Sequence, residues 1–98
     1  ILACDLFDHI ADFIGIVVTH FDTGIEGKYC LHFHKAGECH ECIFKNNAIE
    51  NSQQRGSIVH GTHHSKVENN VLYNVRGANV YIEDGNEMWN TMAYNVAI

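Results

Sequence analysis

Side chains suited to metal binding or acid–base chemistry recur along this chain at similar intervals. His32 lies 28 positions before His60, His60 lies 23 positions before Glu83, and His34 follows two residues after His32. Imidazole and carboxylate together suit Zn²⁺, Mn²⁺ or a similar divalent ion, and they suit Ca²⁺ poorly because Ca²⁺ prefers oxygen ligands. We therefore consider a divalent metal site at His32, His34, His60 and Glu83.

The same residues also fit acid–base catalysis. Glu83 or Asp84 would serve as general acid or base, and His60 or a bound metal would stabilise charge. The residue types leave a third interpretation open, in which the histidines only stack and hydrogen-bond with one another. A metal-buffering surface built from all eight histidines is a further alternative.

Three apolar segments must position these side chains. Residues 29–37, 57–63 and 80–85 each contain an apolar run with a metal-capable side chain, followed by a glycine. Apolar and polar residues alternate in the first of them, which is typical of a β-strand with one buried face. If successive strands stack in parallel register, side chains distant in sequence become neighbours about 4.8 Å apart.

Strand alternation assigns each side chain to one of two faces. Leu31, Phe33, Val59 and Ile82 share one parity and should face the core. Stacking His60 over either His32 or His34 preserves this parity. The other parity predicts an outer face that carries His32, His34, Ile58, His60, Tyr81 and Glu83.

A second element also recurs and points to a repeat fold. Residues 43–51 match residues 66–74 at an offset of 23, and a weaker copy at 89–95 follows 21 positions later. The copies are rich in Val, Ile, Tyr and Asn, and Asn both tolerates left-handed turns and forms amide ladders. Two elements recurring every 21 to 28 residues are typical of a solenoid. We predict an all-β, right-handed, single-stranded parallel β-helix of about four coils over residues 1–98, with residues 13–19 as one buried strand.

Composition limits the partners. The formal net charge is −6 with only six Lys plus Arg, which argues against nucleic acid. No apolar run approaches the roughly 20 residues that cross a bilayer. The two ends lack a natural boundary, so we expect a piece of a longer chain. The remainder of that chain is then a partner. Strand edges with unpaired backbone groups would also permit self-assembly.

Four cysteines permit three disulfide pairings. Cys39 and Cys42 flank His40 and Glu41, and this motif fits half a zinc site. It equally fits a small disulfide loop, or one of the two cysteines could pair with Cys30. Cys4 would then bond elsewhere or remain a thiol.

Three consecutive motifs resemble one family. Residues 28–34 (Lys-Tyr-Cys-Leu-His-Phe-His) resemble the Arg-Tyr-Pro-Ile-His-Phe-His segment of the fibrocystin-like and cell-migration-inducing hyaluronidase family. Arg55 with residues 58–63 resembles the next repeat of that family. Residues 82–85 (Ile-Glu-Asp-Gly) followed by Glu87 resemble its Leu-Glu-Asp-Gly-Val-Glu motif, and residues 90–98 its closing Asn-rich repeat.

The resemblance covers about residues 16–98 and includes departures. Cys30 stands where the family usually has proline, and Lys28 where it has arginine. Residues 20–23 replace a segment that commonly carries Gly-Gln. The eight-glycine domain that precedes the β-helix repeats in the family is not in this sequence.

The family resemblance implies an extracellular or cell-surface protein whose partner is a polysaccharide or other glycan. It also implies a glycoside hydrolase-like, hyaluronidase-like activity, with Tyr81 as an aromatic platform for a sugar ring. Arg55, Lys35 and Arg76 would offset the acidic surface toward a polyanion. In that setting disulfides are favoured over a zinc half-site. The alternative is a non-catalytic structural or adhesive solenoid of a cell-surface or filament protein.

Overall fold

The computed structural model describes residues 13–14, 17–19 and 29–98. The expectations for Cys4, Lys28 and residues 20–23 lie outside these residues. The described chain is all-β, as predicted, and it contains eleven short strands. In chain order they are β1 Phe13–Ile14, β2 Val17–Thr19, β3 Leu31–Glu38, β4 Ile43–Lys45, β5 Ala48–Glu50, β6 Ser57–His63, β7 Lys66–Glu68, β8 Val71–Tyr73, β9 Val80–Ile82, β10 Thr91–Ala93 and β11 Val96–Ala97.

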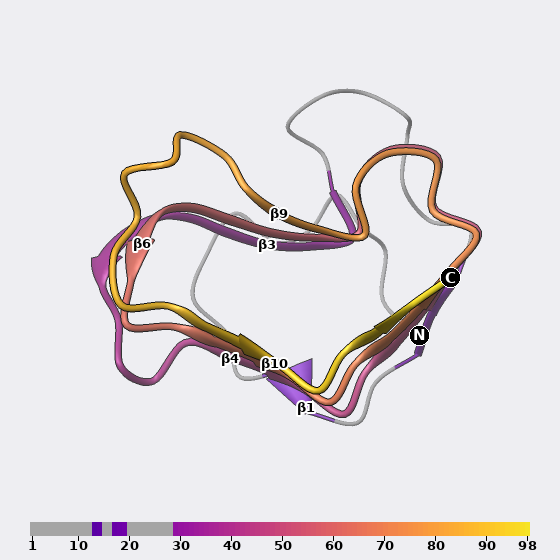
Figure 1. Ribbon diagram of the computed structural model, residues 1–98, viewed down its shortest axis with the longest axis horizontal. Helices are drawn as coiled ribbons and strands as arrows, with labels where there is room; N and C mark the ends of the chain where they lie inside the picture. Colours follow the sequence, from indigo (N-terminus) through magenta and orange to yellow (C-terminus); the bar gives the residue numbers. More distant parts are fainter. Residues whose placement is uncertain (1–12, 15–16, 20–28) are drawn as a thin grey trace.

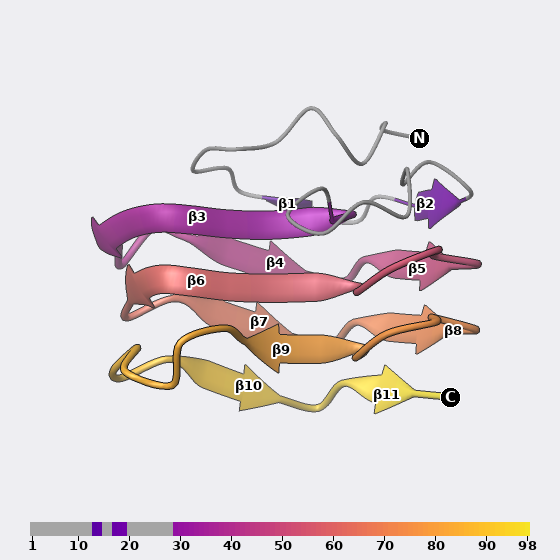
Figure 2. The same cartoon turned by 90° about the horizontal axis from the view of Figure 1, so that it is seen from above.

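The strands form three parallel sheets (Figure 1). Two sheets have four strands, in the orders β1-β4-β7-β10 and β11-β8-β5-β2, and the third has three, in the order β3-β6-β9. Seen from above, each strand lies beside a strand from the preceding stretch of chain (Figure 2). The 23-residue offset between residues 43–51 and 66–74 is confirmed, because Ile43 pairs with Lys66 and Ala48 with Val71.

The predicted right-handed, single-stranded solenoid of about four coils is wrong. The described residues form three separate sheets and no closed sheet, and one of these sheets has three strands where four coils would require four. Most strands are only two or three residues long. A residue with positive φ follows many of them and turns the chain before a longer ladder forms, so the sheets stay short and separate. The single strand expected over residues 13–19 is also wrong, because β1 and β2 belong to different sheets.

Asparagine explains several of these turns. Asn46, Asn51, Asn69 and Asn74 have φ between 54° and 58° and directly follow β4, β5, β7 and β8. Asn adopts this left-handed conformation more readily than other residues with a Cβ atom, because its short amide bonds locally to the backbone. The turns therefore recur wherever the Asn-containing repeat recurs.

A ladder of three buried or half-buried amides supports the turn between the two four-stranded sheets. Asn47 donates from both its backbone nitrogen and its Nδ2 to Oδ1 of Asn70, at 3.0 Å each. Asn70 donates in the same way to Oδ1 of Asn95, again at 3.0 Å. The third repeat copy is thus offset by 25 residues from the second, and the sequence alignment of Asn95 with Asn74 is wrong.

The core lies between the sheets. Phe33 of β3 stacks on Phe44 of β4, with ring centroids 3.7 Å apart and planes 3° apart. The other buried members of this cluster are Cys30, Leu31, Cys39, Cys42, Ile49, Val59, Val67 and Leu72. Leu31, Phe33 and Val59 therefore face the core as predicted, and half-buried Ile82 packs against it.

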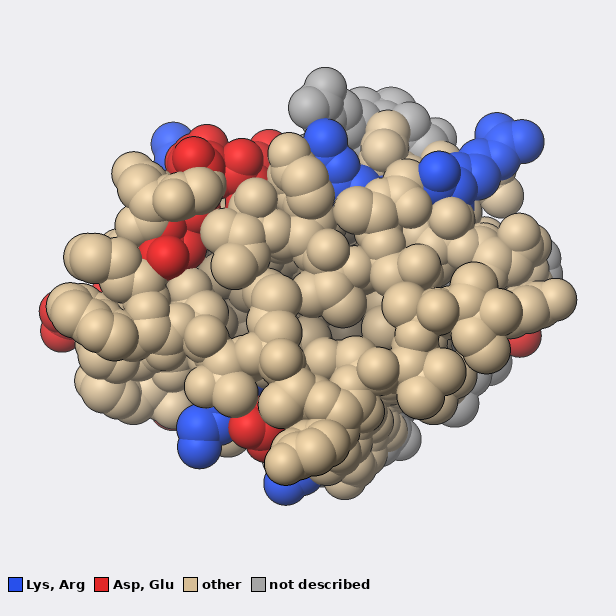
Figure 3. All heavy atoms as spheres, viewed as in Figure 1, with Lys and Arg blue, Asp and Glu red and all other residues tan. Residues whose placement is uncertain are grey.

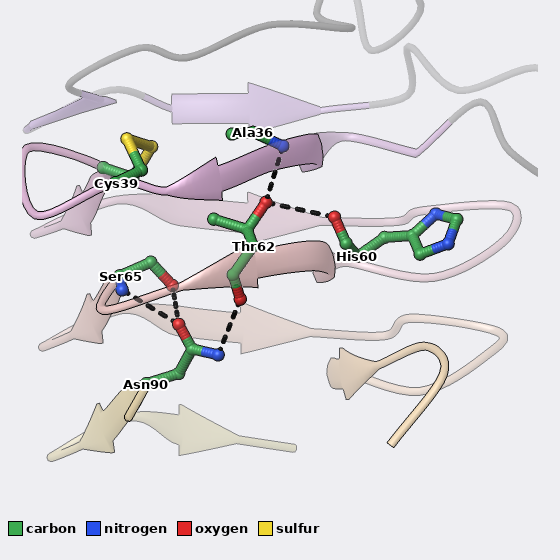
Figure 4. The surroundings of a disulfide bond; sticks show 7 residues. Ala36, Cys39, His60, Thr62, Ser65 and Asn90 are labelled. Atoms are coloured by element: carbon green, nitrogen blue, oxygen red, sulfur yellow. Dashed lines mark hydrogen bonds between the residues drawn. A yellow bond between two sulfur atoms is a disulfide. The ribbon is translucent and has the colours of Figure 1, made fainter. Parts of the chain in front are cut away.

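A disulfide joins Cys39 to Cys42, which was one of the open sequence alternatives. Cys30 keeps its thiol, which donates to the Ser52 hydroxyl at 3.7 Å. Figure 4 shows the hydrogen bonds around the disulfide. The Thr62 hydroxyl accepts from the Ala36 nitrogen and donates to the His60 carbonyl, which fastens β6 to the irregular part of β3. Within the described residues, no helix has the length and apolar character needed to cross a membrane.

Candidate histidine–carboxylate site

The register of the three-stranded sheet brings the predicted site residues together. His34 pairs with His60, which decides between the two registers that the sequence left open. The Glu83 nitrogen donates to the Val59 carbonyl at 3.0 Å, so Glu83 continues the same row immediately after β9. His34, His60 and Glu83 thus lie in one row across three strands.

A second row runs beside the first, and it is more buried than expected. His32 pairs with Ile58, and Ile58 pairs with Tyr81. His32 is only 4% exposed and Ile58 is fully buried, whereas the sequence placed both on an outer face. Neither belongs to the core cluster. The expectation of an open outer face is therefore wrong at these two positions.

Aromatic and guanidinium groups cover this second row. Tyr29 is itself buried and meets His32 edge to face, with ring centroids 5.0 Å apart. Arg55 donates to the Tyr29 hydroxyl at 2.9 Å and lies over the Tyr81 ring, 4.1 Å from its centroid. Tyr29, Arg55 and Tyr81 therefore form a connected cover next to His32 and Ile58.

Three side chains point donor atoms toward one another in this site. Glu83 Oε2 lies 3.5 Å from His60 Nδ1 and 3.9 Å from His32 Nε2. These three atoms all lie within 4.8 Å of one another, which is close enough to share one metal ion. Glu83 Oε2 is buried and has no hydrogen-bond partner within the described part of the chain. We call His32, His60 and Glu83 the His–Glu group.

Asp84 contacts the other side of the His60 ring. Its Oδ2 lies 2.9 Å from His60 Nε2, and its side chain is about half exposed, at 52%. An ionised carboxylate only accepts hydrogen bonds, so this contact places a proton on Nε2. The ring is then oriented with Nδ1 toward Glu83. Asp84 and Glu83 therefore contact the same imidazole, although adjacent residues of a strand have opposite parity.

Arg55 supplies the positive charge nearest to Glu83 among the ion pairs of the site. Its guanidinium lies 4.0 Å from Glu83 Oε1, on the oxygen that does not face the histidines. Arg55 therefore lies beside both Tyr81 and Glu83. Arg55 also occupies one face of the Tyr81 ring, so a sugar could stack only on the other face or on the guanidinium itself.

Glu87 holds the acidic loop that carries Asp84. Its Oε1 accepts from the Gly61 nitrogen at 2.9 Å and from the Asp84 nitrogen at 3.3 Å. Burial raises the pKa of Glu87, but hydrogen bonds from the backbone N–H groups of Gly61, Glu87, Asp84 and Gly85 outweigh it and lower the pKa below 4.5. In Figure 3 acidic side chains gather over the segment that follows β9.

Two predicted site residues lie apart from the His–Glu group. The His34 ring packs 5.2 Å from His32 and 5.0 Å from His60, but it adds no atom to the group of converging ligand atoms. Lys35 is exposed, with φ of 51°, and its side chain lies against Gly61. In the described part of the chain it makes no ion pair with the site.

Tyr29 and Glu87 have no predicted role, although both lie in the motifs that carry the family resemblance. Tyr29 precedes the His32-containing strand by two residues, and Glu87 closes the Glu-Asp-Gly motif. Each acts by holding another site residue: Tyr29 holds Arg55, and Glu87 holds Asp84. Their place inside the family motifs was the sequence signal that could have identified these two residues.

Comparison with known proteins yields one family and several relatives. Residues 9–98 match the family described as CEMIP beta-helix. The chain is 38% identical over 73 residues to Fibrocystin-L of Mus musculus and 36% identical over 73 residues to Fibrocystin-L of Homo sapiens, which covers 74% of this chain and 2% of each relative. It is 36% identical over 73 residues to the protein rliB of Dictyostelium discoideum, which covers 74% of this chain and 6% of that protein. The chain therefore spans only a small part of these relatives, and no solved structure matches it.

Proposed function

Because this chain belongs to the CEMIP beta-helix family, we propose that it is an extracellular module that contacts a polysaccharide and contributes to glycosidic bond cleavage. The fibrocystin-like resemblance seen in the sequence is confirmed by relatives that cover most of the chain. An extracellular setting is supported by the Cys39–Cys42 disulfide, because such bonds persist in oxidising compartments.

The observation that carries the proposal is the position of Arg55. Its guanidinium lies over the Tyr81 ring and 4.0 Å from Glu83. His60 lies next to Glu83, and Asp84 contacts His60. A guanidinium binds a sugar carboxylate with two parallel hydrogen bonds, and an aromatic ring offers an apolar surface to the sugar. We infer that Arg55 and Tyr81 contact an acidic sugar and hold it next to Glu83.

The proposed cleavage uses two carboxylates connected through one imidazole. Asp84 contacts His60 Nε2 at 2.9 Å, and Glu83 faces His60 Nδ1 at 3.5 Å. One carboxyl group would donate a proton to the leaving oxygen, and the other would assist attack by water or stabilise charge. Asp84 is the more exposed of the two, at 52% against 22% for Glu83, and it accepts from His60 as a carboxylate, so we assign activation of the attacking water to Asp84.

Hyaluronan, an acidic polysaccharide, is a suitable probe for the test, with neutral dextran as the comparison. We expect Arg55→Gln to weaken hyaluronan binding by about 10-fold or more, which corresponds to about 1.4 kcal/mol. Lys66→Gln is the matched control, because it removes the same charge from an exposed residue of β7, in another sheet. Equal losses in the two variants, or equal binding of dextran, would contradict a specific glycan contact.

Catalysis is tested separately by Glu83→Gln and Asp84→Asn. Each keeps the shape of its side chain, so we expect glycan binding within about 3-fold of the unmodified protein. Chain cleavage, followed by size-exclusion chromatography of the polysaccharide, should fall by about 100-fold or more, because general acid–base groups contribute on that order. Unchanged cleavage in both variants would remove the catalytic assignment.

A structural or adhesive module without catalysis is the second candidate. It is favoured by the packing of the rings of His32, His34 and His60, whose centroids lie 5.0 to 6.3 Å apart. Under this alternative, His60→Ala lowers the unfolding temperature without changing glycan binding. Measuring both quantities on one preparation separates the two candidates.

A further inference from the structure

We propose that His32, His60 and Glu83 bind one divalent transition-metal ion, with Zn²⁺ as the best fit to these ligands. The three side chains come from β3, from β6 and from the residue after β9, so the parallel register assembles them. Two imidazoles and one carboxylate provide the nitrogen and oxygen ligands that Zn²⁺ favours, and a ligand set with two nitrogen donors disfavours Ca²⁺.

The distances fit a tetrahedral ion. Ligand atoms bonded to Zn²⁺ at about 2.1 Å lie roughly 3.4 Å from one another in that geometry. The separations of Glu83 Oε2 from His60 Nδ1 and His32 Nε2 are 3.5 Å and 3.9 Å, and the third separation is at most 4.8 Å. Small side-chain rotations would close the difference, because the strands that carry these residues are already in register.

The contact geometry also favours a positive species between His60 and Glu83. Asp84 places the proton of a neutral His60 ring on Nε2, so Nδ1 presents a lone pair. That lone pair faces the buried Oε2 of Glu83 at 3.5 Å, and no described residue donates a hydrogen bond to this oxygen. Two acceptors in a shielded site repel one another, and a metal ion bound to both removes the repulsion.

The neighbours of the His–Glu group match the usual surroundings of a zinc site. A carboxylate on the second nitrogen of a ligating histidine fixes its tautomer and orientation, and Asp84 occupies that position. Arg55 lies toward Glu83 Oε1 and leaves Oε2 to the ion. Three protein ligands leave a fourth position for water or another oxygen donor.

The experiment uses the purified protein, stripped with a chelator and titrated with Zn²⁺ by calorimetry. Titration with Co²⁺ adds a visible absorption band whose intensity reports tetrahedral coordination. We expect one equivalent to bind and Glu83→Gln and His60→Ala to weaken binding by about 100-fold, while Asp84→Asn costs at least about 10-fold. Circular dichroism identifies any variant that fails to fold, and Glu83→Gln keeps the side-chain volume in case His60→Ala does not fold.

The matched control is His64→Asn. His64 stacks between His40 and Trp89, outside the His–Glu group, and its φ of 64° suits asparagine. We expect this variant to bind Zn²⁺ as the unmodified protein does. A loss equal to that of His60→Ala would indicate diffuse binding by surface histidines and would overturn the site.

A proton is the competing positive species, and a second measurement separates it from the metal. If ¹⁵N NMR of the chelated protein shows both His60 nitrogens protonated and no stoichiometric Zn²⁺ or Co²⁺ binding occurs, the metal proposal is wrong. The metal inference does not rest on the glycan proposal. Metal binding without hyaluronan binding would contradict only the latter.

Discussion

Single side chains decide where the acidic loop after β9 lies. Glu87 accepts backbone hydrogen bonds from Gly61 in β6 and from Asp84 in its own loop. Asp84 in turn contacts His60 at 2.9 Å. The orientation of the His60 ring therefore depends on a residue that does not touch it.

Replacing Glu87 tests this dependence through the response of stability to pH. The backbone hydrogen bonds outweigh burial and lower the folded-state pKa of Glu87 below 4.5, whereas an unfolded chain restores the ordinary value. The ionised group therefore stabilises the fold above about pH 4.5, and this contribution is lost as pH falls through the lowered pKa. Because the site is only partly buried, we expect Glu87→Gln to cost less than about 1 kcal/mol at pH 7.

Urea unfolding at pH 7, 5 and 3 measures the effect. The difference between Glu87→Gln and the unmodified protein should shrink as the pH approaches 3. Glu68→Gln serves as a control, because Glu68 accepts no side-chain hydrogen bond among those found in the described residues. A difference that stays constant from pH 7 to 3 would contradict the ionic role of Glu87.

Sequence alternation predicted the faces of most site residues but not their exposure. The parity of His32, His34, His60 and Glu83 follows from a period of two, so their shared face was predictable. Ile58 is buried beside Tyr81, and Arg55, which comes from the segment before β6, covers the Tyr81 ring. Alternation within one strand cannot predict a contact between residues that are distant in sequence, so the exposure of Ile58 was not predictable.

At the scale of elements, the Asn ladder fixes where consecutive strands begin. Asn70 is 1% exposed, and its side chain satisfies two backbone groups of the preceding repeat copy. Its Oδ1 accepts from the Asn47 nitrogen, and its Nδ2 donates to the Phe44 carbonyl at 3.0 Å. Removing the amide leaves buried backbone groups without partners.

Asn70→Ala should destabilise the fold by about 2 to 4 kcal/mol, because several buried polar groups lose their hydrogen bonds together. The control is Asn74→Gly, which removes an exposed hydrogen bond of 2.8 Å from the Asn74 side chain to Asn51 Oδ1. Asn74 has φ of 55°, so glycine adds no strain there, and we expect a cost below about 1 kcal/mol. Chemical denaturation of both variants measures the difference, and similar costs would show that the ladder is not the stabilising element.

The third copy of this element shows why alignment from sequence alone went wrong. Asn46 and Asn69 occupy the left-handed turn before the ladder, but Tyr94 occupies it in the last copy, with φ of 58°. The first two copies have a pair of asparagines at this place, and the third copy has only Asn95. Without the pair, the sequence pattern shifted the third copy by four residues.

At the scale of the whole molecule, packing of side chains joins sheets that share no strand. β3 and β4 belong to different sheets, and Phe33 and Phe44 stack between them. The all-β class and the parallel pairing were predictable from apolar runs at repeated offsets. The number of strands in each sheet was not, because it depends on where each turn ends a ladder.

The stacked pair offers a test of whether the sheets fold as one unit. Phe33 and Phe44 are fully buried, with centroids 3.7 Å apart. We expect Phe44→Ala to cost about 3 to 5 kcal/mol, and the exposed Tyr73→Ala less than about 0.5 kcal/mol. If the rings join the sheets, Phe33→Leu and Phe44→Leu will couple by about 1 kcal/mol in a double-mutant cycle, because each ring loses its partner in the other variant. Unfolding followed by circular dichroism and by Trp89 fluorescence should give one shared transition. Two separate transitions, or additive losses of unfolding free energy in the two Leu variants, would mean that other contacts hold the three sheets together.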